Sequence, residues 1–136
     1  MPTPSRWLIR AALVWLVGGL GLGVVMQLPA AAQSPPLRVI WPAYLHSLTV
    51  GWLTQLIIGV ALWLFPRHSA ARPRGSEALG WTTFVCLNLG LLLRVLGEPR
   101  RALGADAGPV LVLSALAQLV AVTAFVVNIW PRVKAR

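Results

Sequence analysis

His46 is the residue of this chain that is best suited to chemistry. It lies in residues 41–65, WPAYLHSLTVGWLTQLIIGVALWLF, a run that is otherwise almost wholly apolar. An imidazole in such a run either makes a hydrogen bond to a neighbouring helix or ligates a metal, including the iron of a haem. Because ionisable groups are costly in apolar segments and tend to mark a site, the sequence predicts one of these two roles for His46.

A second ionisable group, Arg94, lies near the end of a later apolar run, and Glu98 follows it by four residues. Residues at this spacing lie on one face of a helix, so that the two charges can neutralise each other. Alternatively, Arg94 binds an anionic group such as a haem propionate or a lipid phosphate. The sequence leaves both interpretations open.

The elements that position these residues are four apolar runs. With 57% hydrophobic and only 11% charged residues, the 136-residue chain lies outside the range of ordinary soluble domains. Runs of roughly 20 apolar residues are long enough to cross a bilayer, and they predict spans at residues 7–28, 41–65, 78–96 and 109–130. The loops between them are too short for a further domain. We expect one all-α, four-helix transmembrane domain over residues 1–136.

The distribution of basic residues predicts the orientation. The net charge of +9 does not indicate nucleic-acid binding, because the basic residues flank the apolar runs. Eight of them fall on one predicted side of the membrane: Arg6, Arg10, Arg67, Arg72, Arg74, Arg132, Lys134 and Arg136. The other side carries three: Arg38, Arg100 and Arg101. Since basic loops favour the cytoplasm, both termini are expected there.

The first span also has features of a signal peptide. Arg6 and Arg10 precede a long apolar stretch that ends near three consecutive alanines, residues 30–32. Cleavage there would leave three spans in the same orientation. We expect the segment to be retained, because its apolar run is longer than a usual signal core.

Three candidate site residues are expected at a similar depth in the membrane. With a rise of about 1.5 Å per residue, His46 lies about 7 Å along the helix from Trp41, the start of its span. Arg94 lies about 4 to 5 Å along the helix before Gly97, which follows the end of its span. Met26 is two residues from the end of the first span. His46, Arg94 and Met26 are therefore expected to meet near the outer face if their helices pack with these faces inward.

Helix packing accounts for most of the other polar and small residues. On the second span, Gly51, Gln55 and Gly59 form a stripe that favours close helix approach. His46 belongs to a roughly opposite stripe, which predicts a second neighbour; its other members are Thr49, Val50, Leu53, Ile57 and Leu64. Gln55 and Asn88 lie at similar depth and are a predicted pair. Further packing positions are Gly19, Gly23, Cys86, Ala117 and Ala121, and His68 is expected to be a solvated residue outside the membrane.

The segment from His46 through Val50-Gly51-Trp52, Gln55, Gly59-Val60-Ala61 and Phe65-Pro66-Arg67 resembles a membrane segment of haem-copper oxidase subunit I-like proteins. The similarity is greatest to the branch of cbb3-type oxidases and nitric oxide reductases, including small four-span relatives. Residues 74–77 and 88–95 are similar to the same small proteins. The resemblance covers a third to a half of the chain.

The resemblance implies one role for this chain, in which His46 ligates the iron of haem b. The family's catalytic subunit holds its haems and second metal with several histidines, whereas this chain has two, one of them in a span. A binuclear centre is therefore not expected. A second axial ligand would come from His46 of another copy or from Met26, and Arg94 and Arg38 would face the propionates.

Two functions follow as expectations. The first is a haem b-binding or haem-proximal component of a respiratory or electron-transfer complex in a bacterial plasma membrane, in contact with larger subunits or as a homodimer. The alternative is a cofactor-free accessory or assembly subunit that packs against larger partners. Catalysis by the isolated chain is not expected, because paired acids, a nucleophile with a nearby base and a nucleotide-binding loop are missing from the sequence.

Overall fold

The computed structural model describes residues 1–28, 39–65 and 75–133, and the regular structure of these residues is entirely helical. Four of its helical segments are long and apolar enough to span a membrane, which confirms the predicted all-α membrane domain. The elements are α1 (Thr3–Gln27), α4 (Trp41–His46), η1 (Ser47–Thr54), α5 (Gln55–Leu64), α6 (Glu77–Ala102), α7 (Gly108–Ile129) and η2 (Trp130–Arg132).

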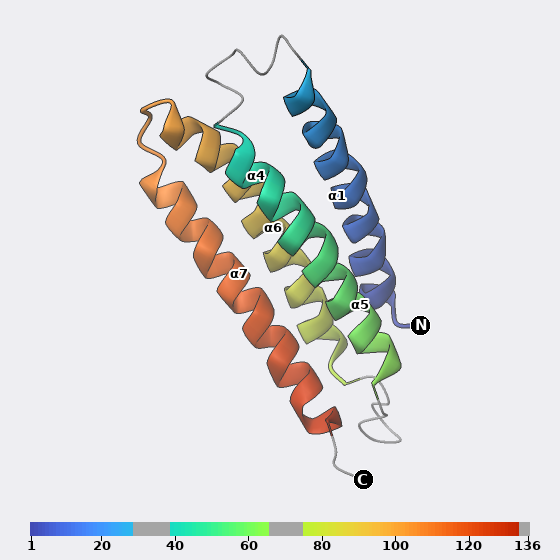
Figure 1. The fold of residues 1–136 in the computed structure, drawn as a ribbon. Coiled ribbons are helices and arrows are strands. Elements are labelled where there is room, and N and C mark those ends of the chain that lie inside the picture. Colours follow the sequence, from blue (N-terminus) through green and yellow to red (C-terminus); the bar gives the residue numbers. More distant parts are fainter. Residues whose placement is uncertain (29–38, 66–74, 134–136) are drawn as a thin grey trace.

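The four spans run alternately up and down, so that the two termini lie at the same end of the bundle (Figure 1). The second span is continuous from α4 through η1 to α5. It packs along α1 over most of its length, and its α4 end contacts α6. α6 and α7 form an antiparallel hairpin.

The third span is longer than predicted. We expected it to end at residue 96, before Gly97, but α6 continues to Ala102 and contains Pro99. Gly97 serves packing instead of termination, because a Cβ atom there would lie 2.9 Å from Cδ2 of Leu111 on α7. The additional turns carry Glu98, whose Oε1 lies 3.5 Å from Nδ1 of His46 on α4, and the exposed Arg101.

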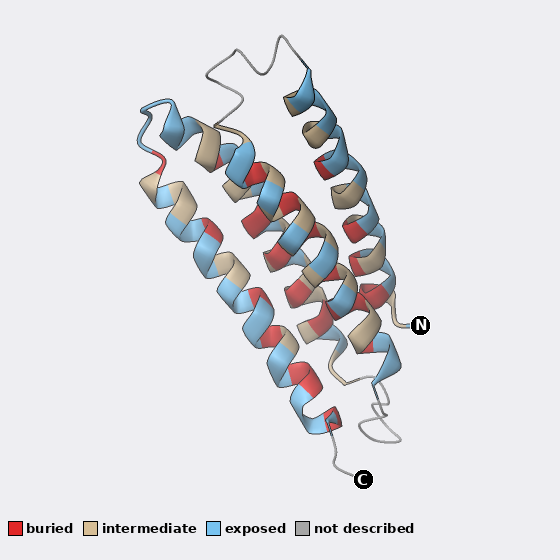
Figure 2. Cartoon of the chain, viewed as in Figure 1, coloured by how far each residue is buried: buried red, intermediate tan, exposed pale blue. Residues whose placement is uncertain are grey.

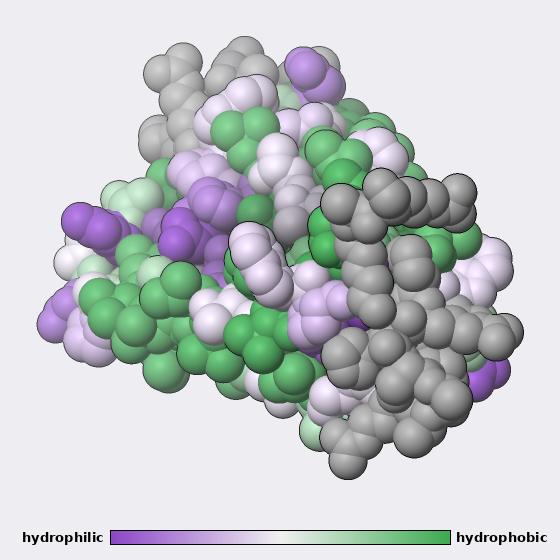
Figure 3. All heavy atoms as spheres, turned by 90° about the horizontal axis from the view of Figure 1, so that it is seen from below, coloured by the Kyte–Doolittle hydropathy of each residue, from purple (hydrophilic) through white to green (hydrophobic). Residues whose placement is uncertain are grey.

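The outward faces of the helices are apolar. α7 buries a narrow stripe against α6 and exposes large aliphatic side chains on its other faces, and α1 does the same (Figure 2). Seen from below, hydrophobic areas of the described residues lie between hydrophilic patches (Figure 3). A bundle with this surface is stable where lipid or another apolar partner surrounds it.

Polar side chains join the helices at the end of the bundle that holds the termini. The Asn128 amide accepts a hydrogen bond from the Ser76 backbone N–H and donates one to the Ser76 carbonyl, at 2.9 and 3.0 Å. Arg132 is fully buried and donates to the carbonyls of Leu62 and Phe65. The ends of α5 and α7 and the start of α6 are thus fixed to one another.

The middle of the second span is a π-helix, η1, which begins directly after His46. The Gln55 backbone N–H reaches the Val50 carbonyl, five residues back. The Thr54 hydroxyl donates to the Thr49 carbonyl at 2.9 Å, again across five residues. A turn of this kind holds more residues than an α-turn, so the faces of α4 and α5 are rotated relative to a regular α-helix.

The small-residue stripe of the second span packs against α1, as predicted. A Cβ atom on Gly51 would lie 2.7 Å from Cγ of Trp15, and one on Gly59 would lie 2.9 Å from Cγ1 of Ile9. In return, Gly19 of α1 admits the side chain of Leu48. These contacts allow the two helix backbones to approach closely.

The prediction of a second neighbour for the opposite stripe is wrong over most of its length. Leu53, Ile57 and Leu64 remain about half exposed or more, at 47%, 58% and 65%. Among the described residues, His46 reaches Glu98 of α6, and Val50 packs partly buried against the hydrophobic core. The register change in η1 explains why α-helical periodicity placed His46 and these residues together.

The predicted pairing of Gln55 with Asn88 is also wrong. The Gln55 side chain donates to the Leu8 carbonyl at 3.3 Å, and Asn88 accepts a hydrogen bond from the Trp15 indole at 2.9 Å. The two amides do lie at similar depth, but each finds its partner on α1. Cys86 packs half-buried against the core cluster, whose members are Leu8, Ile58, Leu62, Leu87, Ala121 and Ile129.

Candidate functional site

His46 is the last residue of α4, and its ring is held between its own helix and α6. Nδ1 lies 2.8 Å from the Pro42 carbonyl oxygen, one turn earlier. The same nitrogen lies 3.5 Å from Oε1 of Glu98 on α6. The side chain is 30% exposed, so it lies at the edge of the bundle and not in its core.

These two contacts determine which ring nitrogen carries the hydrogen in the neutral imidazole. A carbonyl and a carboxylate both accept hydrogen bonds, so Nδ1 must be the donor. Nε2 is then the unprotonated nitrogen, and it has no hydrogen-bond partner among the described residues. Backbone carbonyls commonly orient metal-binding histidines in this way, leaving the other nitrogen available as a ligand.

Glu98 is the centre of the cluster. Its Oε1 atom accepts a hydrogen bond from NH1 of Arg94 at 3.1 Å and faces Nδ1 of His46. The Arg94 and Glu98 side chains are 23% and 12% exposed. This geometry confirms the i, i+4 ion pair that was one of the two interpretations of Arg94.

The cluster is not fully satisfied internally. The Nε atom of Arg94 and the Oε2 atom of Glu98 are buried and have no hydrogen-bond partner. Buried polar atoms without partners are costly and are normally satisfied by water or a ligand. The cluster therefore offers one donor and one acceptor to a further molecule.

Met26, another predicted site residue, is not joined to this cluster. Met26 is half-buried in the last turn of α1, and the described residues show no hydrogen bond between it and His46. At this level α1 meets α4 through Gly23 and Tyr44, whereas His46 faces α6. Arg38 and His68 lie outside the described residues. The structure thus brings together two predicted residues, His46 and Arg94, through Glu98.

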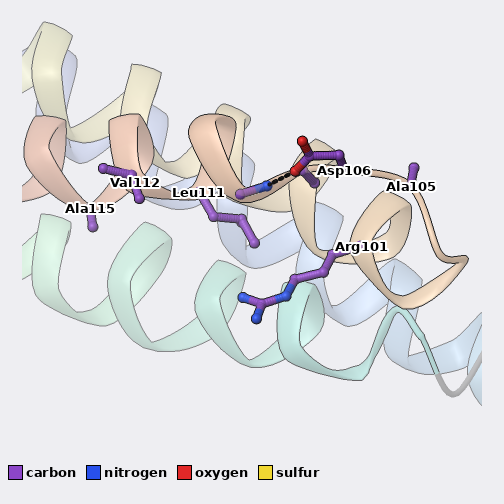
Figure 4. Close-up of a pocket in the computed structure, with 8 residues that line it drawn as sticks. Arg101, Ala105, Asp106, Leu111, Val112 and Ala115 are labelled. Carbon is purple, nitrogen blue, oxygen red and sulfur yellow. Dashed lines mark hydrogen bonds between the residues drawn. The ribbon is translucent and has the colours of Figure 1, made fainter.

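Sequence reasoning missed a groove at the turn between α6 and α7. It has a volume of about 440 Å³, and its lining residues are Arg101, Ala105, Asp106, Ala107, Gly108, Leu111, Val112 and Ala115 (Figure 4). From its position in the sequence, Arg101 was expected only to contribute to the orientation of the spans. The available signal was a basic residue seven positions before the start of an apolar helix, but this signal does not distinguish a groove from an ordinary loop.

Among the described residues, no three histidine, cysteine, aspartate or glutamate side chains come together as a candidate metal site. No protein-family model, curated protein or solved structure matches the chain. Among the described residues, the His46 cluster is the feature whose geometry bears most directly on function.

Proposed function

We propose that this protein is a haem b-binding subunit of a membrane electron-transfer complex, in which Nε2 of His46 would hold the iron. The observation that supports this most directly is the anchoring of Nδ1 on the Pro42 carbonyl, which leaves Nε2 free. A neutral imidazole with one anchored nitrogen can hold a haem iron through its other nitrogen. The resemblance of residues 46–67 to haem-copper oxidase subunit I supports the same role.

His46 would hold the iron, and Arg94 and Arg38 would bind the propionates. Arg94 already donates NH1 to Glu98, but its Nε–H is without a partner and can donate to a further anion. The haem would supply one-electron transfer. The protein would orient it and, through the apolar faces around His46, limit its exposure to water.

A second residue to hold the iron would come from another chain or from Met26. Because His46 lies at the edge of the bundle, its free nitrogen can be reached by a neighbouring subunit. A second copy would supply an equivalent His46 across a twofold axis, and a larger subunit would supply its own ligand. Met26 remains the alternative within the chain, through the last turn of α1.

The test is a reduced-minus-oxidised absorbance spectrum of the full chain purified in detergent, with haem counted per chain. We expect haem in the native protein, none in His46→Ala, and an unchanged amount in the matched control His68→Ala. Two His46 residues sharing one iron give half a haem per chain. Haem absorbance that persists in His46→Ala, or no haem in the native protein, removes the ligand role.

A cofactor-free accessory or assembly subunit is the second candidate. The observation that favours it is the Arg94–Glu98 pair, which neutralises both charges without any ligand. The exposed apolar faces of α1 and α7 would then cover larger membrane subunits. Purification of the chain by itself as a stable species with stoichiometric haem would exclude this candidate.

We also propose that both termini lie in the cytoplasm of a bacterial plasma membrane. The described end of the bundle that carries them includes Arg6, Arg10 and Arg132. The sequence predicts the basic residues of the second loop and the C-terminus on the same side. The excess of basic residues at this end supports the assignment. The His46 cluster would then lie toward the outer surface.

A further inference from the structure

The groove between α6 and α7 lies at the end of the bundle opposite the termini. Its volume of about 440 Å³ is bounded by the last turns of α6, the connecting turn and the first two turns of α7. Because the helices on both sides are membrane spans, the groove is at the level where lipid headgroups meet the hydrocarbon.

One wall of the groove is cationic. Arg101 lines it, is exposed, and has no hydrogen bond or ion pair from its side chain among the described residues. Figure 4 shows its side chain extending from α6 into the space between α7 and α4. Arg100, the preceding residue, does not line the groove.

The acid in the groove is already engaged. Oδ1 of Asp106 accepts a hydrogen bond from the Gly108 backbone N–H at 3.2 Å, at the start of α7. A carboxylate at this position interacts favourably with the positive end of the helix dipole. Asp106 therefore offsets the α7 N-terminus, and the Arg101 guanidinium remains the group available to an external anion.

The other wall is apolar. Leu111, Val112 and Ala115 of α7 line it, and Leu111 and Ala115 lie one turn apart on the same side of the helix (Figure 4). Val112 is 60% exposed although it lies within a membrane span. From Gly108 to Ala115 this wall extends about 10 Å along the helix, from the headgroup level toward the hydrocarbon.

We propose that this groove binds one anionic phospholipid, with its phosphate on Arg101 and the upper part of an acyl chain along Leu111, Val112 and Ala115. Cationic and apolar groups lie in the order in which a phospholipid presents phosphate and chain. Guanidinium groups bind phosphate through charge-assisted hydrogen bonds. A soluble anion would use Arg101 but leave the apolar wall uncovered. His46 does not line this groove, so the lipid site and the haem site can fail independently.

The experiment measures lipid binding to the full chain by native mass spectrometry after delipidation in detergent. Phosphatidylglycerol and phosphatidylcholine with identical acyl chains are added to the native protein, Arg101→Gln and Arg100→Gln. The two variants lose the same charge at adjacent exposed positions, and only Arg101 lines the groove. We expect the first phosphatidylglycerol to bind Arg101→Gln roughly tenfold more weakly than the native protein or Arg100→Gln.

A second variant, Ala115→Phe, tests the apolar wall by filling it, and it is expected to weaken phosphatidylglycerol binding without changing the charge. Equal weakening by Arg101→Gln and Arg100→Gln would overturn the proposal in favour of general surface charge. Equal binding of the two lipids would overturn it as well. So would full displacement of the lipid by inorganic phosphate at the same concentration, because the apolar wall would then contribute nothing.

Discussion

Arg132 provides a quantitative test of how the four helices are held together. It is completely buried at the end of the last span and donates NH1 to the Leu62 carbonyl at 3.2 Å and NH2 to the Phe65 carbonyl at 2.7 Å. The residue that would normally bond to the Leu62 carbonyl in a continuing helix is Pro66, which has no amide hydrogen. The guanidinium therefore satisfies carbonyls that the sequence of α5 leaves without donors.

Arg132→Met is expected to lower stability markedly. Hydrogen bonds from a charged donor contribute about 1.5 to 3 kcal/mol each, so two of them amount to about 3 kcal/mol or more. For a chain of this size, about 3 kcal/mol corresponds to a fall of roughly 10 °C in Tm. Lysine keeps the charge but lacks the planar guanidinium that donates to two carbonyls at once. The Tm of Arg132→Lys is therefore expected to lie between those of Arg132→Met and the native protein.

Thermal unfolding in detergent, followed by tryptophan fluorescence, measures this effect. The matched control is Arg6→Gln, because Arg6 is exposed and its side chain makes a single, long hydrogen bond of 3.4 Å to the Thr3 hydroxyl. We expect the control to unfold at nearly the native temperature. If Arg132→Met unfolds at the same temperature as this control, the carbonyls of α5 do not depend on Arg132 and the reasoning is refuted.

Two further predictions concern packing and topology. Gly90→Ala should destabilise the α6–α7 hairpin by about 1 to 3 kcal/mol, because its Cβ would lie 2.8 Å from Cγ of Gln118 and 2.9 Å from the Ser114 carbonyl oxygen. Gly21→Ala should instead stabilise α1 by up to about 1 kcal/mol, since nothing lies within 4 Å of that position. The same unfolding assay compares the stabilities of the two variants. Stability changes of equal sign and size would contradict the close packing of α6 against α7 at Gly90. A reporter that functions only in the cytoplasm should be active when it is fused to the C-terminus; activity of a periplasmic reporter there would reverse the orientation.

The sequence predicted the helices and the depths of their polar residues well, because both depend on composition and on the constant rise of a helix. The four spans are confirmed, and His46 and Arg94 do reach the same layer, where Glu98 joins them. The ion pair of Arg94 was accessible because its partner lies one turn away on the same helix.

Rotation and contacts between helices were less predictable. Gln55 and Asn88 lie at equal depth, yet each bonds to α1, because the direction in which a side chain points depends on tertiary packing. The groove at Arg101 and the burial of Arg132 depend on how the ends of different helices meet. These contacts cannot be inferred from the residues next to Arg101 or Arg132 in the sequence. Haem ligation by His46 stays a prediction.

The π-helix after His46 gives the second span two phases. In a regular α-helix, His46 and Gln55 would be nine residues and about 180° apart, on opposite faces. Each extra residue that a π-turn holds beyond an α-turn reduces the angle between the two side chains around the helix axis by about 100°. As a result, α5 can present Gln55 to α1 while α4 directs His46 toward Glu98 on α6. The direction of the His46 imidazole toward α6 therefore depends on how many residues the segment 47–54 contains more than on which residues they are. Loss of one residue in this segment would leave a continuous apolar helix of nearly the same length, with its histidine turned away from its carboxylate.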